Sequence, residues 1–306
     1  MLVVDDRNAK DIHRDGDVDA VVRKAIRLGM EPVRAVQMAT LNPARYFRLD
    51  GYGGIGPGYH ANLLVLSDLR EFKVDEVYCR GRKVAENGRP LFQAGSPRTK
   101  FMEDTFKVRP YDRSNLELKA NGSGAFPVVE VVPDQIGTRS VDVRPEIVDG
   151  LVQVDLERDV IKIAVIERHK TTGNIGIGLV KGFGMKRGAI GASIAHDSHN
   201  IVVVGVDDDD IFAAAKEIER NRGGLACVVD GVVIASLALP IAGLLSFEPL
   251  EFVVAGIEDL ERAATKLGCS LPSPYSTLSF LALPVIPELR VTDMGVVDVA
   301  AGRVIR

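Results

Sequence analysis

The chain opens with a short apolar run, Leu2–Val4, which stops at two adjacent aspartates, Asp5 and Asp6. An apolar run that ends at charged residues is typical of a buried strand in a parallel sheet. Such a strand needs a neighbour on each side, because its backbone N–H and C=O groups must all find partners. The sequence therefore predicts either that later segments supply those neighbours or that the chain begins inside a larger domain.

Helices are predicted to follow this run. Apolar residues spaced three and four apart form one stripe over residues 18–26, which predicts an amphipathic helix. Pro32 suits the first turn of a second helix. Asn42 and Pro43 are expected to end or kink that helix, because the residue before a proline is disfavoured in the helical conformation. Residues 44–49 are expected to form another short helix.

A small β unit is predicted after the helices. Glycines cluster over residues 51–58 and indicate turns rather than a helix. Residues 63–66 are expected to form a strand, and residues 74–79 and 83–85 are expected to pair as a hairpin. These short segments together predict a separate small sheet.

The second half of the chain is predicted to be a mixed α/β domain. Residues 101–145 carry prolines among charges and short β runs, and we expect a linker with extended strands. From residue 146 onward, β-branched runs alternate with amphipathic stretches. The elements expected there are strands at 160–166 and 201–206, a helix at 211–221, a hairpin at 225–236, and a helix marked by Ile257, Leu260, Ala264 and Leu267.

Composition and charge argue against several classes of function. The net charge is −4, so the chain lacks the basic surplus of nucleic-acid-binding proteins, and we expect no nucleic-acid partner. No apolar run reaches the length of a membrane span, and the N-terminus does not have the pattern of a signal peptide. The 3 cysteines are sparse and far apart, which is typical of reduced thiols in small core positions. We therefore expect a cytoplasmic protein without a membrane partner.

Several motifs follow one another in a consistent order. They are VDDR at Val4–Arg7, MATLNPA at Met38–Ala44, GIGPGYHANLLVL at Gly54–Leu66, KTTGNIGIGLVKGFG at Lys170–Gly184, RGAIGASIAHDSHN at Arg187–Asn200 and TLSFLALPVIPELR at Thr277–Arg290. With these motifs the chain resembles the C-terminal part of the adenine deaminases of the amidohydrolase superfamily. The resemblance covers nearly all 306 residues. One departure is Asn62, where the family usually has an aspartate in a structural role.

The resemblance implies an α/β (mixed α+β) fold in four parts. Residues 1–50 would be the end of a TIM-like barrel, with its last strand and helices. Residues 51–100 would be the small β-sandwich part, and residues 101–145 a linker with extended strands. Residues 146–306 would be the adenine deaminase C-terminal α/β domain.

The resemblance also implies a reaction. Adenine deaminases are hydrolases acting on cyclic amidines, and in purine salvage they convert adenine and water to hypoxanthine and ammonia with Mn²⁺ or Fe²⁺. Asp5 would be the metal ligand and catalytic proton acceptor on the last barrel strand. Asp6 and Arg7 would bind or position the substrate, adenine.

The metal ligands expected from the resemblance are incomplete in this sequence. The family uses an HxH pair, a carboxylate and further histidines, whereas the 5 histidines here include no HxH and none precedes Asp5. One aspartate cannot hold a divalent ion that normally takes several protein ligands. We therefore expect the chain to be an inactive fragment when alone, with a separate N-terminal barrel polypeptide as partner. The alternative is a non-catalytic subunit or binding module derived from an adenine deaminase.

A homo-oligomer is expected as well, with local disorder of residues 1–50 as the alternative. Barrel elements without their neighbours would leave strand edges and apolar faces uncovered, and such surfaces favour association.

The densest polar cluster of the second half is HDSHN at His196–Asn200. If the segment is helical, His196 and His199 lie on one face and offer two imidazoles to a substrate or metal. The alternative is a hydrogen-bonded loop that packs the domain. We take His196 and His199 as candidate substrate-binding residues.

Two further segments invite a ligand-binding interpretation that their spacing argues against. Gly173–Gly184 lacks the strand, glycine loop and helix order of a dinucleotide site, so close backbone packing or a lid over a ligand is expected. Asp207–Asp210 lacks the alternating ligands of a calcium loop. We expect the four aspartates to be a solvated helix start.

Overall fold

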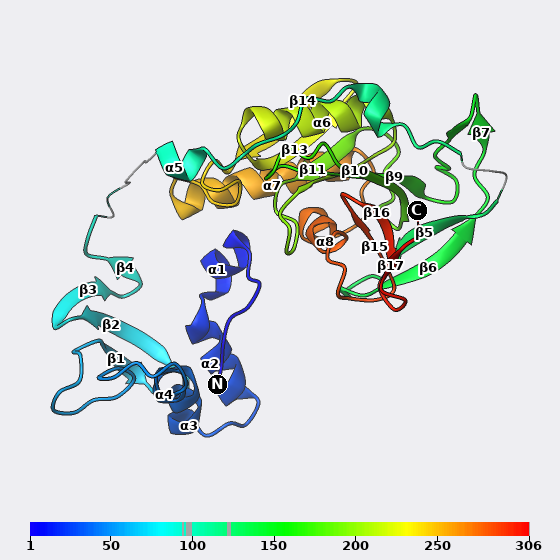
Figure 1. Cartoon of the computed structure of the whole chain (residues 1–306). Coiled ribbons are helices and arrows are strands. Elements are labelled where there is room, and N and C mark those ends of the chain that lie inside the picture. Colours follow the sequence, from blue (N-terminus) through cyan, green and yellow to red (C-terminus); the bar gives the residue numbers. More distant parts are fainter. Residues whose placement is uncertain (94, 96–99, 121–123, 306) are drawn as a thin grey trace. The chain divides into compact units, whose positions relative to one another are not determined.

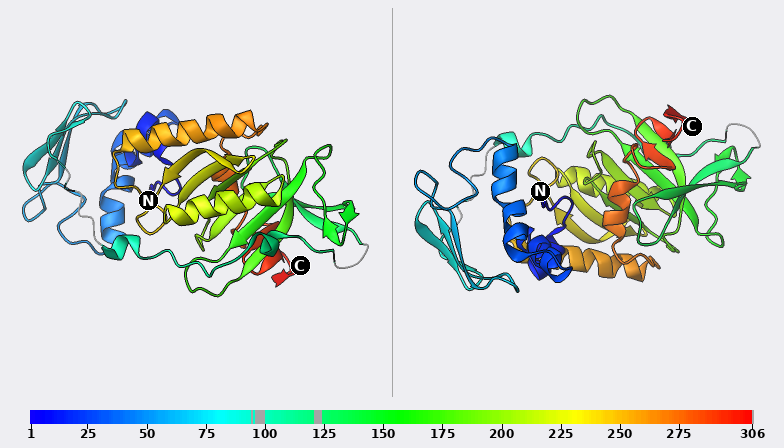
Figure 2. Two further views of the ribbon diagram at one scale, coloured as in Figure 1. Left: turned by 90° about the horizontal axis from the view of Figure 1, so that it is seen from above. Right: turned by 90° about the horizontal axis from the view of Figure 1, so that it is seen from below.

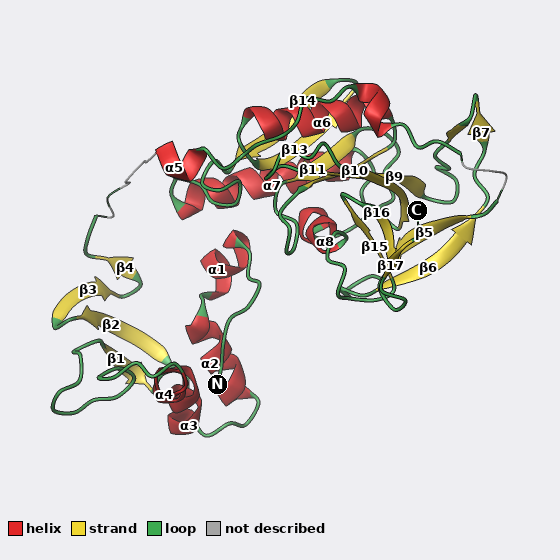
Figure 3. Cartoon of the chain, viewed as in Figure 1, coloured by secondary structure: helices red, strands yellow, loops and turns green. Residues whose placement is uncertain are grey.

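A computed structural model describes residues 1–93, 95, 100–120 and 124–305. The chain divides into two compact units, Met1–Pro97 and Arg98–Arg306, and each is considered by itself. Figure 1 labels most elements of the two units, and Figure 3 distinguishes their helices from their strands. The mixture of helices and sheets confirms the predicted fold class.

The first unit begins with helices α1 (Ala9–Asp15), α2 (Val18–Arg27), α3 (Pro32–Ala39) and α4 (Leu41–Tyr46). α2 and α3 confirm the predicted apolar stripe and the predicted proline start. The short helix expected at residues 44–49 begins three residues earlier, at Leu41. Pro43 lies in the first turn of α4, where its missing N–H group costs no helical hydrogen bond.

The prediction of a strand at Leu2–Val4 is wrong, since these residues have no regular secondary structure. The Leu2 N–H group donates instead to the carbonyl of Met38, 2.8 Å away at the end of α3. The Leu2 side chain packs against a small core formed by Val22, Ala35 and Phe72. The apolar run thus has no strand partner, and the Leu2 N–H group finds its hydrogen-bond acceptor at the end of a helix instead.

A four-stranded antiparallel sheet completes the first unit. Its strands follow one another as β1 (Leu63–Asp68), β2 (Lys73–Cys79), β3 (Arg82–Glu86) and β4 (Arg89–Pro90). β1 and the β2–β3 hairpin confirm the predicted small sheet. Cys79 lies exposed at the end of β2, so the prediction of a core position is wrong for this cysteine and correct for the buried Cys227 and Cys269.

The second unit is built on an eight-stranded sheet with the order β14-β13-β11-β12-β9-β10-β5-β6. The strands are β5 (Phe126–Val131), β6 (Thr138–Val143), β9 (Val160–Ile166), β10 (Ile175–Lys181), β11 (Ala189–Ala192), β12 (Ile201–Gly205), β13 (Gly224–Val229) and β14 (Val232–Ala238). β5 and β6 come from the segment expected as a linker with extended strands, and they form one edge of the sheet. β10 and β5 run parallel, and the other strand pairs in the sheet are antiparallel.

Both faces of this sheet are covered, which explains why β9 is apolar at nearly every position. Ile161, Ile163 and Val165 face a core shared with α7 (Leu250–Lys266) and α8 (Pro274–Phe280). Ala164 and Ile166 face the opposite core, shared with α6 (Asp208–Arg220). Figure 2 gives two further views of these helices and the sheet.

Smaller elements complete the second unit. They are α5 (Lys100–Glu103), the 3-10 helix η1 (Arg113–Leu116), the pair β7 (Ile147–Val148) and β8 (Leu151–Val152), and the sheet of β15 (Leu289–Thr292), β16 (Gly295–Asp298) and β17 (Arg303–Val304). Among the residues that the structure describes, no helix is long and apolar enough to cross a membrane.

The four aspartates at the start of α6 are more than a solvated helix start. Asp207 caps the helix by accepting a hydrogen bond from the Asp210 N–H group at 2.8 Å. Asp208 pairs with the buried Lys162 of β9. Asp210 is 2% exposed and accepts hydrogen bonds from the N–H groups of the β13–β14 turn, including Gly231 at 2.7 Å. The solvated interpretation is therefore wrong for Asp208 and Asp210, because each binds a neighbouring strand or turn.

The glycine-rich segment Gly173–Gly184 confirms close backbone packing. Most of it is strand β10, against which β15 and β16 lie. A Cβ atom on Gly176 would stand 1.8 Å from the Thr292 carbonyl oxygen, so only glycine lets the two backbones approach this closely.

Replacing Gly176 with alanine is expected to lower the free energy of unfolding by more than about 3 kcal/mol, because the new methyl group collides with backbone that has no room to shift. Chemical denaturation monitored by circular dichroism measures this change. Gly137→Ala is the matched control, since its Cβ would meet nothing closer than the Pro287 oxygen at 3.8 Å. Equal losses for the two variants would contradict the packing argument.

Candidate functional site

Asp5, Asp6 and Arg7 lie together at the start of the first unit. Asp5 is exposed and has a φ of 60°, and its Oδ1 atom accepts a hydrogen bond from the Asp6 N–H group at 2.8 Å. The Arg7 guanidinium turns to α1, where Nη2 lies 3.1 Å from Asp15 Oδ2 and 3.1 Å from the Asp11 carbonyl oxygen. Arg7 is thus tied to the helix that follows it, while the Asp5 carboxylate faces solvent.

His196 and His199 come together in a tight turn of the second unit, between β11 and β12. The turn is not helical, so the helical-face argument is wrong, but the two imidazole rings still lie 5.9 Å apart between centroids. The His196 ring packs on Phe280 of α8 at 4.6 Å. His199 Nδ1 accepts a hydrogen bond from the Ala195 N–H group at 3.3 Å. The turn therefore presents two half-buried imidazoles at one place.

A second loop, residues 167–172, meets this turn. His169 Nε2 lies 2.6 Å from the Ser198 carbonyl oxygen. The Glu167 carboxylate holds the loop's shape, since it accepts hydrogen bonds from the N–H groups of Lys170 at 2.7 Å and Thr172 at 2.9 Å, and from His169. Burial by itself would raise the pKa of Glu167, but these hydrogen bonds outweigh it and hold the pKa below its usual value.

Arg168 holds the His196–His199 turn in place through a hydrogen bond to its backbone. It is 1% exposed, its Nε–H group donates to the His199 carbonyl oxygen, and Nη2 donates to the Ala242 carbonyl oxygen at 3.1 Å. Its guanidinium lies over the Phe106 ring at 4.7 Å. Burial lowers the pKa of Arg168 to about 10, so the side chain is charged at neutral pH.

Asn200 closes the turn on its other side. It is 3% exposed, and its Nδ2 atom donates to Asp293 Oδ1 at 3.3 Å. The other oxygen of Asp293 accepts a hydrogen bond from Asn174 Nδ2 at 3.1 Å. The β15–β16 turn is thereby tied to both polar loops.

The environment of His199 favours its neutral form. Burial and the nearby His196 lower its pKa, and Arg168 and His169 act in the same direction, while Asp197 opposes them. His199 is therefore neutral at pH 7, and because its Nδ1 atom accepts the Ala195 N–H group, its proton lies on Nε2, which is left as a donor.

Sequence reasoning found the two histidines and missed the residues that hold them. Glu167, Arg168 and Asp293 were not singled out, although a charged pair directly after the apolar strand β9 was a readable signal. A charge that follows a fully buried strand must either reach solvent or be satisfied inside the fold. Here both Glu167 and Arg168 are satisfied largely by backbone groups.

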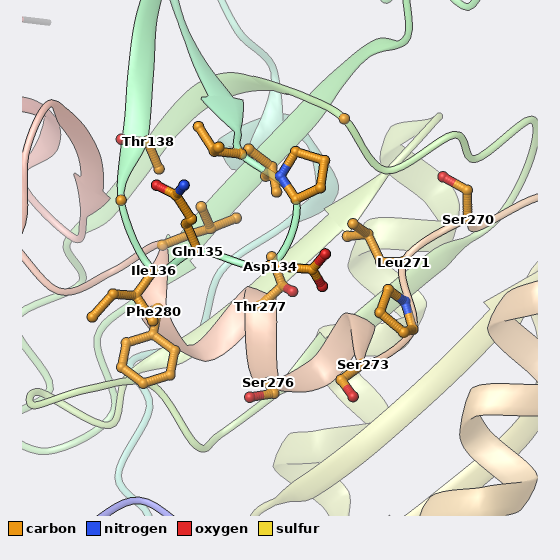
Figure 4. Close-up of a pocket in the computed structure, with 17 residues that line it drawn as sticks. Asp134, Gln135, Ile136, Thr138, Ser270, Leu271, Ser273, Ser276, Thr277 and Phe280 are labelled. Carbon is orange, nitrogen blue, oxygen red and sulfur yellow. The ribbon is translucent and has the colours of Figure 1, made fainter.

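Phe280, on which the His196 ring packs, also lines a cavity. This cavity has a volume of about 470 Å³ and lies between the β5–β6 connection and α8. Figure 4 shows Asp134, Gln135 and Thr277 among its lining residues, with Phe280 at one side. The lining combines hydroxyl groups and Asp134 with apolar side chains, and its ten labelled residues include no basic side chain.

A metal centre needs several converging donors, and the described residues do not provide one. Across residues 1–93, 95, 100–120 and 124–305, no group of three or more histidine, cysteine, aspartate or glutamate side chains is placed to hold a metal ion. Asp5 and the His196–His199 turn therefore do not fit a complete metal site by themselves.

Comparison with known proteins places the chain in a family. The model of the adenine deaminase C-terminal domain matches residues 135–303, which is more than half of the chain, and that of the amidohydrolase family matches residues 1–84. An adenine deaminase of Dehalococcoides mccartyi is 52% identical over 305 residues, covering 100% of this chain and 53% of the relative.

Two further relatives agree with this match. Adenine deaminase 2 of Carboxydothermus hydrogenoformans is 43% identical over 100% of this chain and 54% of the relative. An adenine deaminase of Methanothrix thermoacetophila is 46% identical over 98% of this chain and 52% of the relative. The chain thus spans about half the length of the curated relatives it matches, and it belongs to the adenine deaminase family.

Proposed function

We propose that the chain forms part of an adenine deaminase, which hydrolyses adenine to hypoxanthine and ammonia in purine salvage. The observation that carries the proposal is the match over the whole chain to relatives named for this activity, at 52% identity in one case. The relatives are about twice as long, so the proposal concerns an enzyme to which this chain contributes one portion.

Within that enzyme, Asp5 is the catalytic residue of this chain and one of its metal ligands. An exposed carboxylate that follows an apolar run suits both a metal ligand and an acceptor of the proton released during hydrolysis. Asp6 and Arg7 contribute to substrate binding, with Arg7 held on α1 by Asp15. These roles follow from the family resemblance of the VDDR motif.

Membership of this family implies a divalent metal, and we propose Mn²⁺ or Fe²⁺. The described residues of this chain do not make a metal site by themselves. The remaining ligands are proposed to lie in the region of the relatives that this chain does not span.

His196 and His199 are proposed to bind the substrate. A purine carries acceptor nitrogens along its edges, and the Nε2–H group of a neutral imidazole can donate to one of them. The lowered pKa of His199 suits this role at neutral pH, because only the neutral ring keeps Nδ1 as the acceptor of the Ala195 N–H group while Nε2–H donates to the substrate.

The proposed partner is a separate barrel polypeptide that covers the exposed apolar side chains of the first unit. Leu28, Tyr46, Phe47 and Ile55 are each more than 60% exposed, and a partner that covered them would remove this apolar surface from water. We further propose that the assembly is a cytoplasmic homo-oligomer.

Reconstitution tests the proposed function. The 306-residue chain, co-expressed with the N-terminal region of the Dehalococcoides relative, is expected to release ammonia from adenine when manganese is supplied, and the chain alone is not. Asp5→Asn should lower the rate of the reconstituted enzyme by about a thousandfold, because it removes a proton acceptor and a ligand.

Asp50→Asn is the control, since Asp50 is an exposed carboxylate of the same unit without an assigned role. Full activity of the Asp5→Asn enzyme would contradict the role of Asp5. Absence of turnover in every combination, with folded partners, would favour the non-catalytic binding module.

The substrate role of the two histidines predicts a selective effect on KM. His196→Gln and His199→Gln are each expected to raise KM for adenine about tenfold in the reconstituted enzyme, because each removes one hydrogen bond worth about 1.4 kcal/mol. Steady-state kinetics measure the change, with the exposed His13→Gln as control. An unchanged KM in both variants would place the turn outside the substrate site.

A further inference from the structure

The second unit contains two arginines that are almost completely buried, and their surroundings differ. Arg290 is 0% exposed, and its three nitrogen atoms all donate to backbone carbonyl groups, among them Leu283, Leu289 and Ile136. Backbone groups of the fold thus supply hydrogen-bond partners for all three nitrogen atoms of Arg290, as expected for an arginine with a purely structural role.

Arg168 is as deeply buried but incompletely satisfied. Its Nε and Nη2 groups donate to carbonyls, whereas Nη1 has no hydrogen-bond partner among the described residues. The Oδ1 atom of Asn200 is also buried without a partner, one residue after the His199 carbonyl that Arg168 binds. Unsatisfied buried polar atoms cost free energy, so natural folds keep them where they serve a purpose.

The guanidinium has little freedom to move away from this position. The Phe106 ring covers it at 4.7 Å, and Gly243 leaves space for it, since a Cβ atom there would stand 2.8 Å from Arg168 Cζ. The positive charge of Arg168 is therefore held in a fixed position next to the turn that carries both histidines.

We propose that Arg168 is a positioning residue for the His196–His199 turn, and that Asn200 assists it. Arg168 fixes the His199 carbonyl through Nε, and its charge opposes protonation of the adjacent imidazole. Both effects keep His199 in the neutral, oriented form in which Nδ1 accepts the Ala195 N–H group and Nε2–H can donate to a purine nitrogen. The inference deepens the proposed function, because it rests on the substrate-binding role of this turn.

Four charged or titratable groups face the His199 ring, and each has a distinct effect. His196 on the same turn, His169 on the neighbouring loop and Arg168 after β9 oppose its protonation, and Asp197 favours it. Removing Arg168 leaves the other three in place, so the contribution of the guanidinium can be isolated.

The test is the titration of His199, followed by NMR of the imidazole Cε1–H groups in the 306-residue chain. Arg168→Met and Arg168→Gln are expected to raise the pKa of His199 by about half a unit or more, because both remove the positive charge. Arg168→Lys should leave the pKa near the wild-type value, because it keeps the charge, but should speed hydrogen exchange of the His199 and Asn200 amides.

Arg187→Met is the matched control, because it removes an exposed positive charge from the same unit. If Arg168→Met does not fold, Arg168→Gln and Arg168→Lys still separate charge from bonding. The proposal is overturned if His199 titrates identically in wild type, Arg168→Gln and Arg187→Met.

Kinetics of the reconstituted enzyme separate this inference from the proposed function. Arg168→Lys is expected to raise KM for adenine about fivefold with kcat within about twofold, since the turn is loosened but the reacting groups remain. If His199 titration responds to Arg168 and KM does not, Arg168 still holds the turn but the turn's role in substrate binding fails.

Discussion

The complete burial of strand β9 is the constraint on which the second unit depends. Because β9 is central in the sheet and covered on both faces, it can tolerate polar groups only where a partner is supplied. Lys162 is its one charged residue, is 6% exposed, and pairs with Asp208 at the start of α6. A single buried ion pair therefore fixes where α6 begins against the sheet, and the aspartates next to it cap the helix and hold the β13–β14 turn.

The same constraint continues past the end of β9 and produces the polar site. Glu167 and Arg168 follow the strand directly and remain buried, so the fold must supply hydrogen-bond partners for both charges. Backbone groups of the two adjoining loops are the closest available partners. Glu167 collects N–H groups from its own loop, and Arg168 reaches carbonyls of the His199 turn and of the segment around Ala242. The hydrogen bonds to Glu167 and Arg168 therefore hold the two loops and the segment around Ala242 together.

The sequence predicted the regular elements well where one local pattern decided them. The β-branched run at 160–166 and the Asp230-Gly231 turn are examples, since both turn residues have positive φ as a type I′ turn requires. Leu2–Val4 was predicted wrongly because a strand depends on partners that periodicity cannot reveal. Arg168 was missed for a related reason, since its role comes from carbonyls contributed by residues 31 and 74 positions away. The sequence pointed to the His196–His199 motif, but the segment expected to be helical is a turn in the structure.

The pKa shifts of Glu167 and His199 make the stability of the site depend on pH. The folded pKa of Glu167 is lowered, so its hydrogen bonds contribute stability above its ordinary value of 4.5 that is lost as the pH falls through the folded value. The folded pKa of His199 is lowered as well, so below its ordinary value of 6.5 the unfolded chain takes up a proton more readily than the fold does. Protonation of His199 therefore weakens the turn first, and loss of the Glu167 carboxylate weakens the adjoining loop at lower pH. Since Arg168 stays charged throughout this range, it opposes protonation of His199 in the fold, and Nδ1 therefore keeps its hydrogen bond from the Ala195 N–H group to a lower pH than it would without the guanidinium.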